Sequence, residues 1–172
     1  MLVYRDPISQ DELSSDSYPM TLKFNDTIME VTAANMRADG GIDESLIGGN
    51  ASAEGGDEGG ADDNAITGIN VVMNGRLNAT QFGKKDFKVY MGAWFKRMAK
   101  WVEENKGAER AAAFKKDGMT AFKEIFANFK DWELYVGENM DPDGTLVFMN
   151  YREDGVTPYF WMFKDALEEE KF

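Results

Sequence analysis

The sequence predicts an α+β fold, in which a small and mainly antiparallel β domain carries one inserted antiparallel helical hairpin. Short runs of alternating apolar and polar residues lie near both ends of the chain, which is typical of strands. Between them, residues 84–130 contain two apolar stripes with helical spacing. Because strands are predicted on both sides of the helices, we expect a single domain over residues 1–172, a usual domain length.

The N-terminal segment, residues 1–33, predicts short strands joined by a tight turn. Leu2, Val3 and Tyr4 begin the first strand. Apolar residues then alternate with polar ones from 18 to 24, and a further apolar run follows at 28–31. The pair Asn25-Asp26 between these two runs favours a hairpin turn.

Residues 38–66 have a different composition. They contain eight Gly and eight Asp or Glu, with no Lys or Arg. Such a segment buries too little apolar surface to offset the entropy of ordering its backbone, so we expect a flexible acidic loop. A strand is expected at 66–74, followed by a tight turn at Asn74-Gly75 and a second strand that runs to Phe82.

The inserted segment, residues 84–130, predicts two helices separated at Gly107, which suits the end of a helix. The first helix carries a 3.6-residue apolar stripe: Phe87, Met91, Trp94, Phe95, Met98, Trp101 and Val102. The apolar face of the second helix contains Phe114, Phe122, Ile125, Phe126 and Phe129. Gly118 lies on that face, where its simplest use is to let the two helices approach closely.

The C-terminal part returns to strands. Three strands are predicted, at residues 132–136, 145–151 and 156–163. Turns are expected between them, at Asp141-Pro142-Asp143-Gly144 and Glu153-Asp154-Gly155.

The composition excludes several kinds of chemistry. The chain has neither cysteine nor histidine, which removes disulfides, thiolate zinc sites and mechanisms that use a Ser-His or Cys-His pair. Any bound metal would need oxygen ligands, which suits calcium or magnesium. The start of the sequence does not look like a signal peptide, and no apolar run is long enough for a membrane span, so a cytoplasmic or nuclear location is expected.

The charge is divided unevenly along the chain. The formal net charge is −12, which disfavours nucleic acids and anionic membranes as partners. Residues 84–130 hold twelve basic and six acidic residues, or +6, so the remainder of the chain carries −18. The hairpin is therefore expected to form a basic arm on an acidic body, although helices also use lysine simply for solubility.

Several motifs resemble the translationally controlled tumour protein family, and the resemblance extends over essentially the whole chain. They are YRDPISQDELSSDSY at 4–18, LIGGNASAEG at 46–55, ANFKDWELYVGEN at 127–139, GENMDPDG at 137–144, YREDGVTPY at 151–159 and EEEKF at 168–172. The resemblance implies a β-tent fold related to the chaperones of Rab GTPases, without their zinc site and without a catalytic centre. It implies roles in growth and survival through a Rheb-type small GTPase, translation elongation factor 1, Bcl-family survival proteins, tubulin and calcium.

The resemblance also implies functional residues. Glu12, which follows Asp11, and Glu138 match positions on the face proposed to meet the small GTPase. Ser45 matches a position that is phosphorylated in the family. Tubulin binding would involve the basic arm, with Lys96, Arg97 and Lys100 as its candidate residues. The simpler interpretations are a salt bridge or helix cap for the two glutamates and an unmodified linker serine.

A calcium site is a further expectation, and no other cofactor is required. Residues 139–150 come close to an EF-hand loop, but Asn150 stands where the bidentate glutamate is needed, so the segment reads as a β-turn. Asp141 and Asp143 in this turn, with Asn50 and Glu54 in the acidic loop, are the candidate ligands of a weak site.

Two departures from the family and two alternatives remain. The chain ends in Phe172, where relatives often end in cysteine, so a disulfide-linked dimer is impossible and a monomer is expected. Ala166 stands at a local turn where the family commonly has glycine. The main alternative function is calcium and microtubule binding. An enzyme with paired carboxylates would need both of them to converge in a deep pocket.

Overall fold

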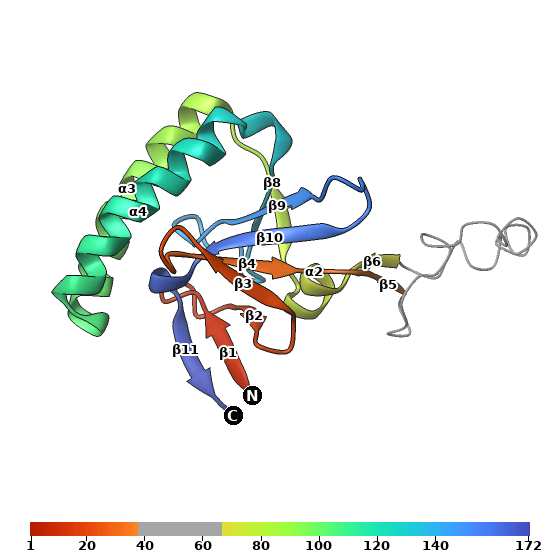
Figure 1. Cartoon of the computed structure of the whole chain (residues 1–172), viewed down its shortest axis with the longest axis horizontal. Helices are drawn as coiled ribbons and strands as arrows, with labels where there is room; N and C mark the ends of the chain where they lie inside the picture. The colour runs from red at the N-terminus through yellow and green to blue at the C-terminus, as the bar shows by residue number, and fades with distance from the viewer. Residues whose placement is uncertain (38–66) are drawn as a thin grey trace, which may run out of the picture.

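The computed structural model describes residues 1–37 and 67–172, so the acidic loop predicted at 38–66 lies outside the described residues. The described part has the predicted α+β fold, with antiparallel sheets on one side and a helical hairpin packed along them (Figure 1). The two chain ends lie next to each other, because the N-terminal amine of Met1 donates to the carbonyl of Phe172 at 2.9 Å.

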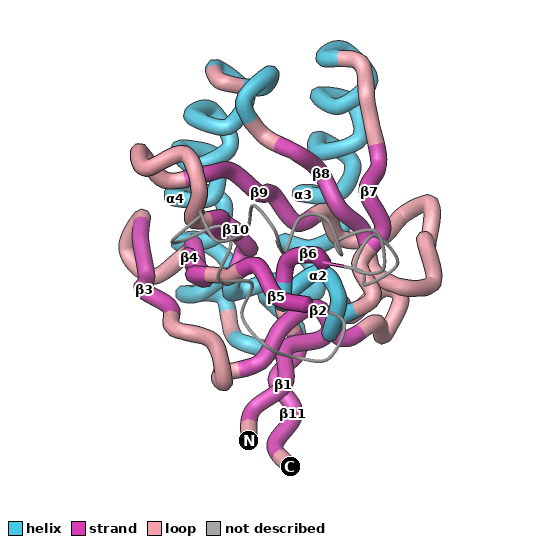
Figure 2. Tube along the Cα trace, turned by 90° about the vertical axis from the view of Figure 1, so that its right-hand side faces the viewer, coloured by secondary structure: helices cyan, strands magenta, loops and turns pink. Residues whose placement is uncertain are grey.

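The larger sheet has six strands in the order β3-β4-β10-β9-β8-β7, and every pairing in it is antiparallel. Its members are β3 (Met20–Lys23), β4 (Ile28–Thr32), β7 (Asn78–Thr80), β8 (Glu133–Val136), β9 (Val147–Tyr151) and β10 (Pro158–Phe163). β3 and β7 form its two edges (Figure 2). The predicted turn between β3 and β4 is confirmed, since Asn25 and Asp26 adopt positive φ there.

A second sheet has three strands in the order β11-β1-β2. β1 (Leu2–Arg5) was expected, whereas β2 (Glu12–Ser15) and β11 (Glu168–Lys171) were not. All four residues of β11 are exposed, so the strand has no apolar alternation that sequence could reveal. Its pairing with β1 and the ion pair between Arg5 and Glu170 form it instead.

The hairpin consists of α3 (Lys84–Lys106) and α4 (Ala108–Ala127), joined at Gly107 as expected. Gly107 has a φ of +98°, a conformation that glycine adopts without steric cost. Six of the seven residues in the predicted α3 stripe are buried, and only Trp101 is partly exposed. On α4, Phe114, Phe122 and Ile125 are buried, and Phe126 lies partly exposed at the edge of the same core.

Two hydrophobic cores lie on the two faces of the large sheet. In β10, Trp161 and Phe163 belong to the core shared with the hairpin, while Phe160 and Met162 belong to the core shared with β1, β2 and α2 (Asn70–Gly75). The strand is therefore buried on both faces, which explains why its sequence is continuously apolar rather than alternating. Both cores together position the loops that carry the candidate site.

The predicted strand at 66–74 is wrong over most of its length. The structure has the short strand β6 (Thr67–Ile69), which pairs with β5 (Asn35–Arg37), and then α2. The side-chain oxygen of Asn70 accepts from the backbone N–H groups of Ala34 and Val71, at 3.0 and 2.7 Å, and this bends the chain away from the β5–β6 ladder. An apolar run as short as Val71-Val72-Met73 fits a strand as well as a helix, so periodicity could not distinguish the two.

Asn74-Gly75 is correspondingly the end of α2 and not a hairpin turn. The helix stops at Arg76, which has the left-handed φ of +53°. The turn at Ala166 is a 3-10 helix, η3 (Lys164–Ala166), in which the methyl group of Ala166 is fully buried.

Candidate partner-binding face

A buried carboxylate joins two loops that are far apart in the sequence. Asp11, 6 % exposed, accepts hydrogen bonds from the backbone N–H of Asn139 at 3.1 Å and from its side-chain amide at 2.7 Å. Gly137 lies so close that an added Cβ would be 2.4 Å from a carboxylate oxygen of Asp11. This contact holds the loop that precedes β2 against the loop that follows β8.

Asp6, at the start of the loop that precedes β2, also joins this loop to the segment between β8 and β9. Its carboxylate accepts from the N–H and the hydroxyl of Thr145, both at 2.9 Å, and from Ile8 and Ser9 in its own turn. Asp6 is only 1 % exposed, so these four neutral donors replace the water that a buried carboxylate loses.

These contacts bring together the chain segments that carry Glu12 and Glu138. Glu12 follows Asp11, and Glu138 precedes Asn139. Both also border the end of α2, because an added Cβ on Gly75 would be 3.3 Å from the carbonyl oxygen of Glu12, and Arg76 contacts Glu138. The Arg76–Glu138 ion pair measures 3.1 Å and is exposed, with 74 % and 54 % of the two side chains accessible.

The hairpin is tied to the same loop. The hydroxyl of Tyr90 donates to the carbonyl of Gly144, and the indole N–H of Trp94 donates to the Thr145 hydroxyl at 3.0 Å. Burial, together with the nearby carboxylates of Asp143 and Asp6, raises the pKa of Tyr90 to about 12, so its hydroxyl is a donor at neutral pH. Thus α3 and the loop at 137–145 form one connected unit.

The candidate arm residues Lys96, Arg97 and Lys100 are all exposed on α3, on the side away from the core. Arg97 lies 3.7 Å from the carboxylate of Asp143. The arm therefore has the accessibility that a charged partner would need, and one of its cations borders the acidic turn.

The candidate calcium residues Asp141 and Asp143 lie in a turn, as the sequence predicted. The N–H of Gly144 donates to the carbonyl of Asp141 at 2.9 Å, and the N–H of Asp143 donates to the Asp141 side chain at 2.8 Å. Over residues 1–37 and 67–172, no three acidic side chains come together as a metal site would require. The other candidates in the loop, Asn50, Glu54 and the phosphorylation candidate Ser45, lie outside the described residues.

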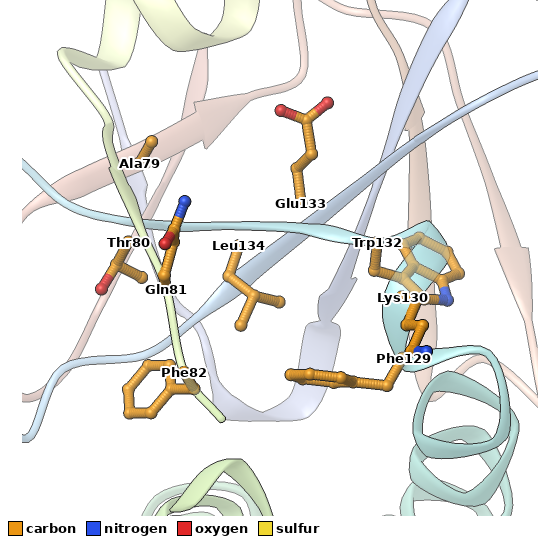
Figure 3. A pocket seen from close by; sticks show the side chains of 9 residues that line it. All are labelled: Ala79, Thr80, Gln81, Phe82, Phe129, Lys130, Trp132, Glu133 and Leu134. Atoms are coloured by element: carbon orange, nitrogen blue, oxygen red, sulfur yellow. The ribbon is translucent and has the colours of Figure 1, made fainter. Parts of the chain in front are cut away.

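A hollow of about 280 Å³ opens where β7 and β8 diverge. Phe82 and Phe129 lie on either side of Leu134, while Glu133 points the opposite way (Figure 3). Lys130 and Glu133 are the charged residues that line it, so this hollow does not hold the pair of converging carboxylates that the enzyme alternative needs.

Sequence reasoning missed several residues that shape this face. Asp6 and Asp11 look like ordinary loop acids, and Arg76 falls in a stretch predicted as a strand. The pattern Asp6-Pro7-Ile8-Ser9 is a signal for a turn closed by its own aspartate, but nothing local shows that the same carboxylate reaches Thr145, 139 positions away.

In the described part of the chain, no helix has the length and apolar character of a membrane span.

Comparison with known proteins gives a consistent result. The family model described as translationally controlled tumour protein matches residues 1–168. The translationally-controlled tumor protein homolog of Branchiostoma belcheri is 45 % identical over 172 residues, covering 100 % of both chains. The Homo sapiens translationally-controlled tumor protein is 44 % identical over 172 residues, covering 99 % of both chains. A solved structure, the Translationally Controlled Tumor-associated Protein p23fyp from Schizosaccharomyces pombe, superimposes with a TM-score of 0.79 at 41 % identity, with 100 % of both chains covered.

Proposed function

Because this chain belongs to the translationally controlled tumour protein family, we propose that it is a non-enzymatic, cytoplasmic binding protein of growth and survival that binds a Rheb-type small GTPase. Its surface holds partners and does not transform them. The family resemblance also extends the proposal to translation elongation factor 1 and to Bcl-family survival proteins.

The observation that supports the GTPase proposal is the Asp11–Asn139 contact, which joins the loops that carry Glu12 and Glu138. Two carboxylates on one exposed face suit a partner with basic residues around its nucleotide site. They could also compete for the magnesium ion that such a site contains. The net charge of −12 would speed association with a basic surface.

Binding of the purified protein to a nucleotide-free Rheb-type GTPase at low salt tests this proposal. We expect Glu12→Val, Glu12→Gln and Glu138→Gln each to weaken binding by about tenfold, the usual effect of losing a charge that is paired across an interface. Glu153→Gln is the matched control, because Glu153 is an exposed glutamate in the turn between β9 and β10. Absence of binding by the unmodified protein would rule out the GTPase role.

A second candidate function is microtubule binding through the basic arm. The exposure of Lys96, Arg97 and Lys100 on α3 favours it, because tubulin is an acidic partner and exposed cations can reach it. Neutralising the three residues to glutamine should reduce co-sedimentation with microtubules. Neutralising Lys115, Lys116 and Lys123, which are exposed on α4, is the control for a loss of charge alone. An equal loss of microtubule co-sedimentation in both triple variants would argue against a site on α3.

We also propose weak calcium binding at Asp141 and Asp143. Two turn carboxylates supply fewer ligands than the six to eight oxygens that calcium takes, so affinity should be low. A calcium titration followed by NMR should shift the backbone signals of both residues. The double variant Asp141→Asn and Asp143→Asn should abolish those shifts, and unchanged shifts in it would move the site elsewhere.

A further inference from the structure

Met140 is an exposed apolar side chain in an unusual backbone conformation. Its side chain is 58 % exposed, and its φ is +51°. Its N–H donates to the carbonyl of Gly137 at 3.0 Å, so it is the last residue of a four-residue turn, where glycine is favoured. The left-handed region is unfavourable for a side chain such as methionine, and such strain concentrates at functional sites.

The loop that presents Met140 is fixed on both sides. The preceding residue, Asn139, is held twice by the buried carboxylate of Asp11. After Met140, the turn at 141–144 is closed by a backbone hydrogen bond from Gly144 to Asp141, and Tyr90 on α3 donates to Gly144. A residue presented by a fixed loop loses little backbone entropy when it enters a partner, which is a property of good interface anchors.

Acidic residues lie near Met140 along the chain and next to the Asp11–Asn139 contact. Glu138 and Asp141 lie within two positions of Met140 in the sequence, and Glu12 lies next to Asp11, which holds Asn139. Arg76 is the cation that pairs with Glu138, and this pair is solvent-exposed and so easily exchanged for another. A complementary partner surface would therefore combine an apolar socket with a rim of lysine or arginine.

We propose that Met140 is the apolar anchor of the GTPase-binding face, and that it enters an apolar socket on the GTPase that is bordered by basic side chains. The inference rests on the proposed function and adds a residue to it. Glu12 and Glu138 then select a basic rim and guide association, while burial of Met140 slows dissociation.

The test measures binding to a nucleotide-free Rheb-type GTPase by Met140→Gln, Met140→Asn and Met140→Leu, with Met119→Gln as the matched control. Met119 is also an exposed methionine, 39 % accessible, but it lies on α4. We expect Met140→Gln and Met140→Asn to raise the dissociation constant about tenfold or more, mainly through a faster off-rate. Met140→Leu and Met119→Gln should stay within about threefold of the unmodified protein.

Met140→Asn also separates binding from folding. Asparagine tolerates the left-handed conformation, so the melting temperature of this variant should not fall even though its binding does. Gly137→Ala tests positioning, since its Cβ would displace Asp11 and move the loop while keeping the Met140 side chain. We expect it too to weaken binding.

The outcomes separate the two proposals. If the unmodified protein binds and Glu138→Gln weakens binding, but Met140→Gln binds as tightly as the unmodified protein, only the role of Met140 is overturned. Equal losses in Met140→Gln and Met119→Gln would overturn it as well. If the unmodified protein does not bind the GTPase at all, both proposals fall.

Discussion

Glu30 on β4 shows how the body accommodates a buried charge. It is 5 % exposed, and its carboxylate accepts from the indole N–H of Trp161 at 2.9 Å and pairs with Arg152 at 3.1 Å and Lys23 at 3.2 Å. Burial raises the pKa of Glu30, but the hydrogen bonds from these three partners outweigh burial, so the pKa lies below its ordinary value of 4.5. Lys23 on β3, Trp161 on β10 and Arg152, directly after β9, thus stabilise the charged form.

This arrangement predicts a pH-dependent contribution to stability. Because the pKa of Glu30 is lower in the folded state, its contribution is fully present above about pH 4.5 and is lost as the pH falls through the folded-state pKa. We expect Glu30→Gln to lower the free energy of unfolding by about 2 kcal/mol at pH 7, since a charged hydrogen-bond acceptor is lost. At pH 3 the difference from the unmodified protein should shrink.

Urea denaturation at both pH values measures this effect. Glu153→Gln, in an exposed turn, should change stability by less than about 0.5 kcal/mol at either pH. A destabilisation by Glu30→Gln that is as large at pH 3 as at pH 7 would show that packing, and not charge, determines it.

At the scale of elements, two glycines in the hairpin have opposite surroundings. A Cβ added to Gly92 on α3 would meet nothing within 4 Å. A Cβ added to Gly118 on α4 would lie 3.3 Å from Phe95. Phe95 cannot easily move, because its ring packs against those of Trp94 and Phe163 at centroid distances of 5.0 and 5.2 Å. The sequence interpretation of Gly118 as a point of close approach is confirmed.

We therefore expect the same substitution to have opposite effects at the two sites. Gly92→Ala should raise the free energy of unfolding by about 0.5–1 kcal/mol, because alanine loses less backbone entropy in a helix. Gly118→Ala should lower it by about 1–2 kcal/mol, because overpacking outweighs that gain. Thermal and urea unfolding of both variants provide the measurement, and a stabilised Gly118→Ala would mean that the helices can separate without cost.

At the scale of the whole molecule, the hairpin is part of the body and does not project from it as a free arm. Phe87 and Phe95 on α3 share one core with Phe148 and Phe163 of the sheet. Near the loop that joins the helices, Arg110 donates two hydrogen bonds to Asp165 of η3, at 2.9 and 2.7 Å. Removal of residues 84–130 would therefore expose one face of the sheet, and full-length charge variants are the better test of the basic arm.

This shared core predicts a single cooperative unfolding transition. Helical circular dichroism, which reports on α3 and α4, and fluorescence of the tryptophans, which lie in both the hairpin and the sheet, should give the same urea midpoint. An earlier midpoint for the helical signal would contradict the prediction, because it would mean that the hairpin can separate from a sheet that remains folded.

The sequence by itself determined the class of the fold, the hairpin and most strands of the large sheet. Each of these elements repeats a local pattern: a 3.6-residue stripe on α3, an alternation in β3, an apolar run in β10. The motifs from YRDPISQDELSSDSY to EEEKF also sufficed to recognise the family, because they recur in order over the whole chain.

Only the tertiary structure decided the nature of α2, the strands β2 and β11, and the face where the segments of Glu12 and Glu138 meet. β11 has no buried side chain, and α2 is too short for its periodicity to be read. The face depends on hydrogen bonds between Asp11 and Asn139, which are 128 positions apart. Local patterns report which surfaces a segment must bury, whereas such contacts depend on where two loops meet once both cores are packed.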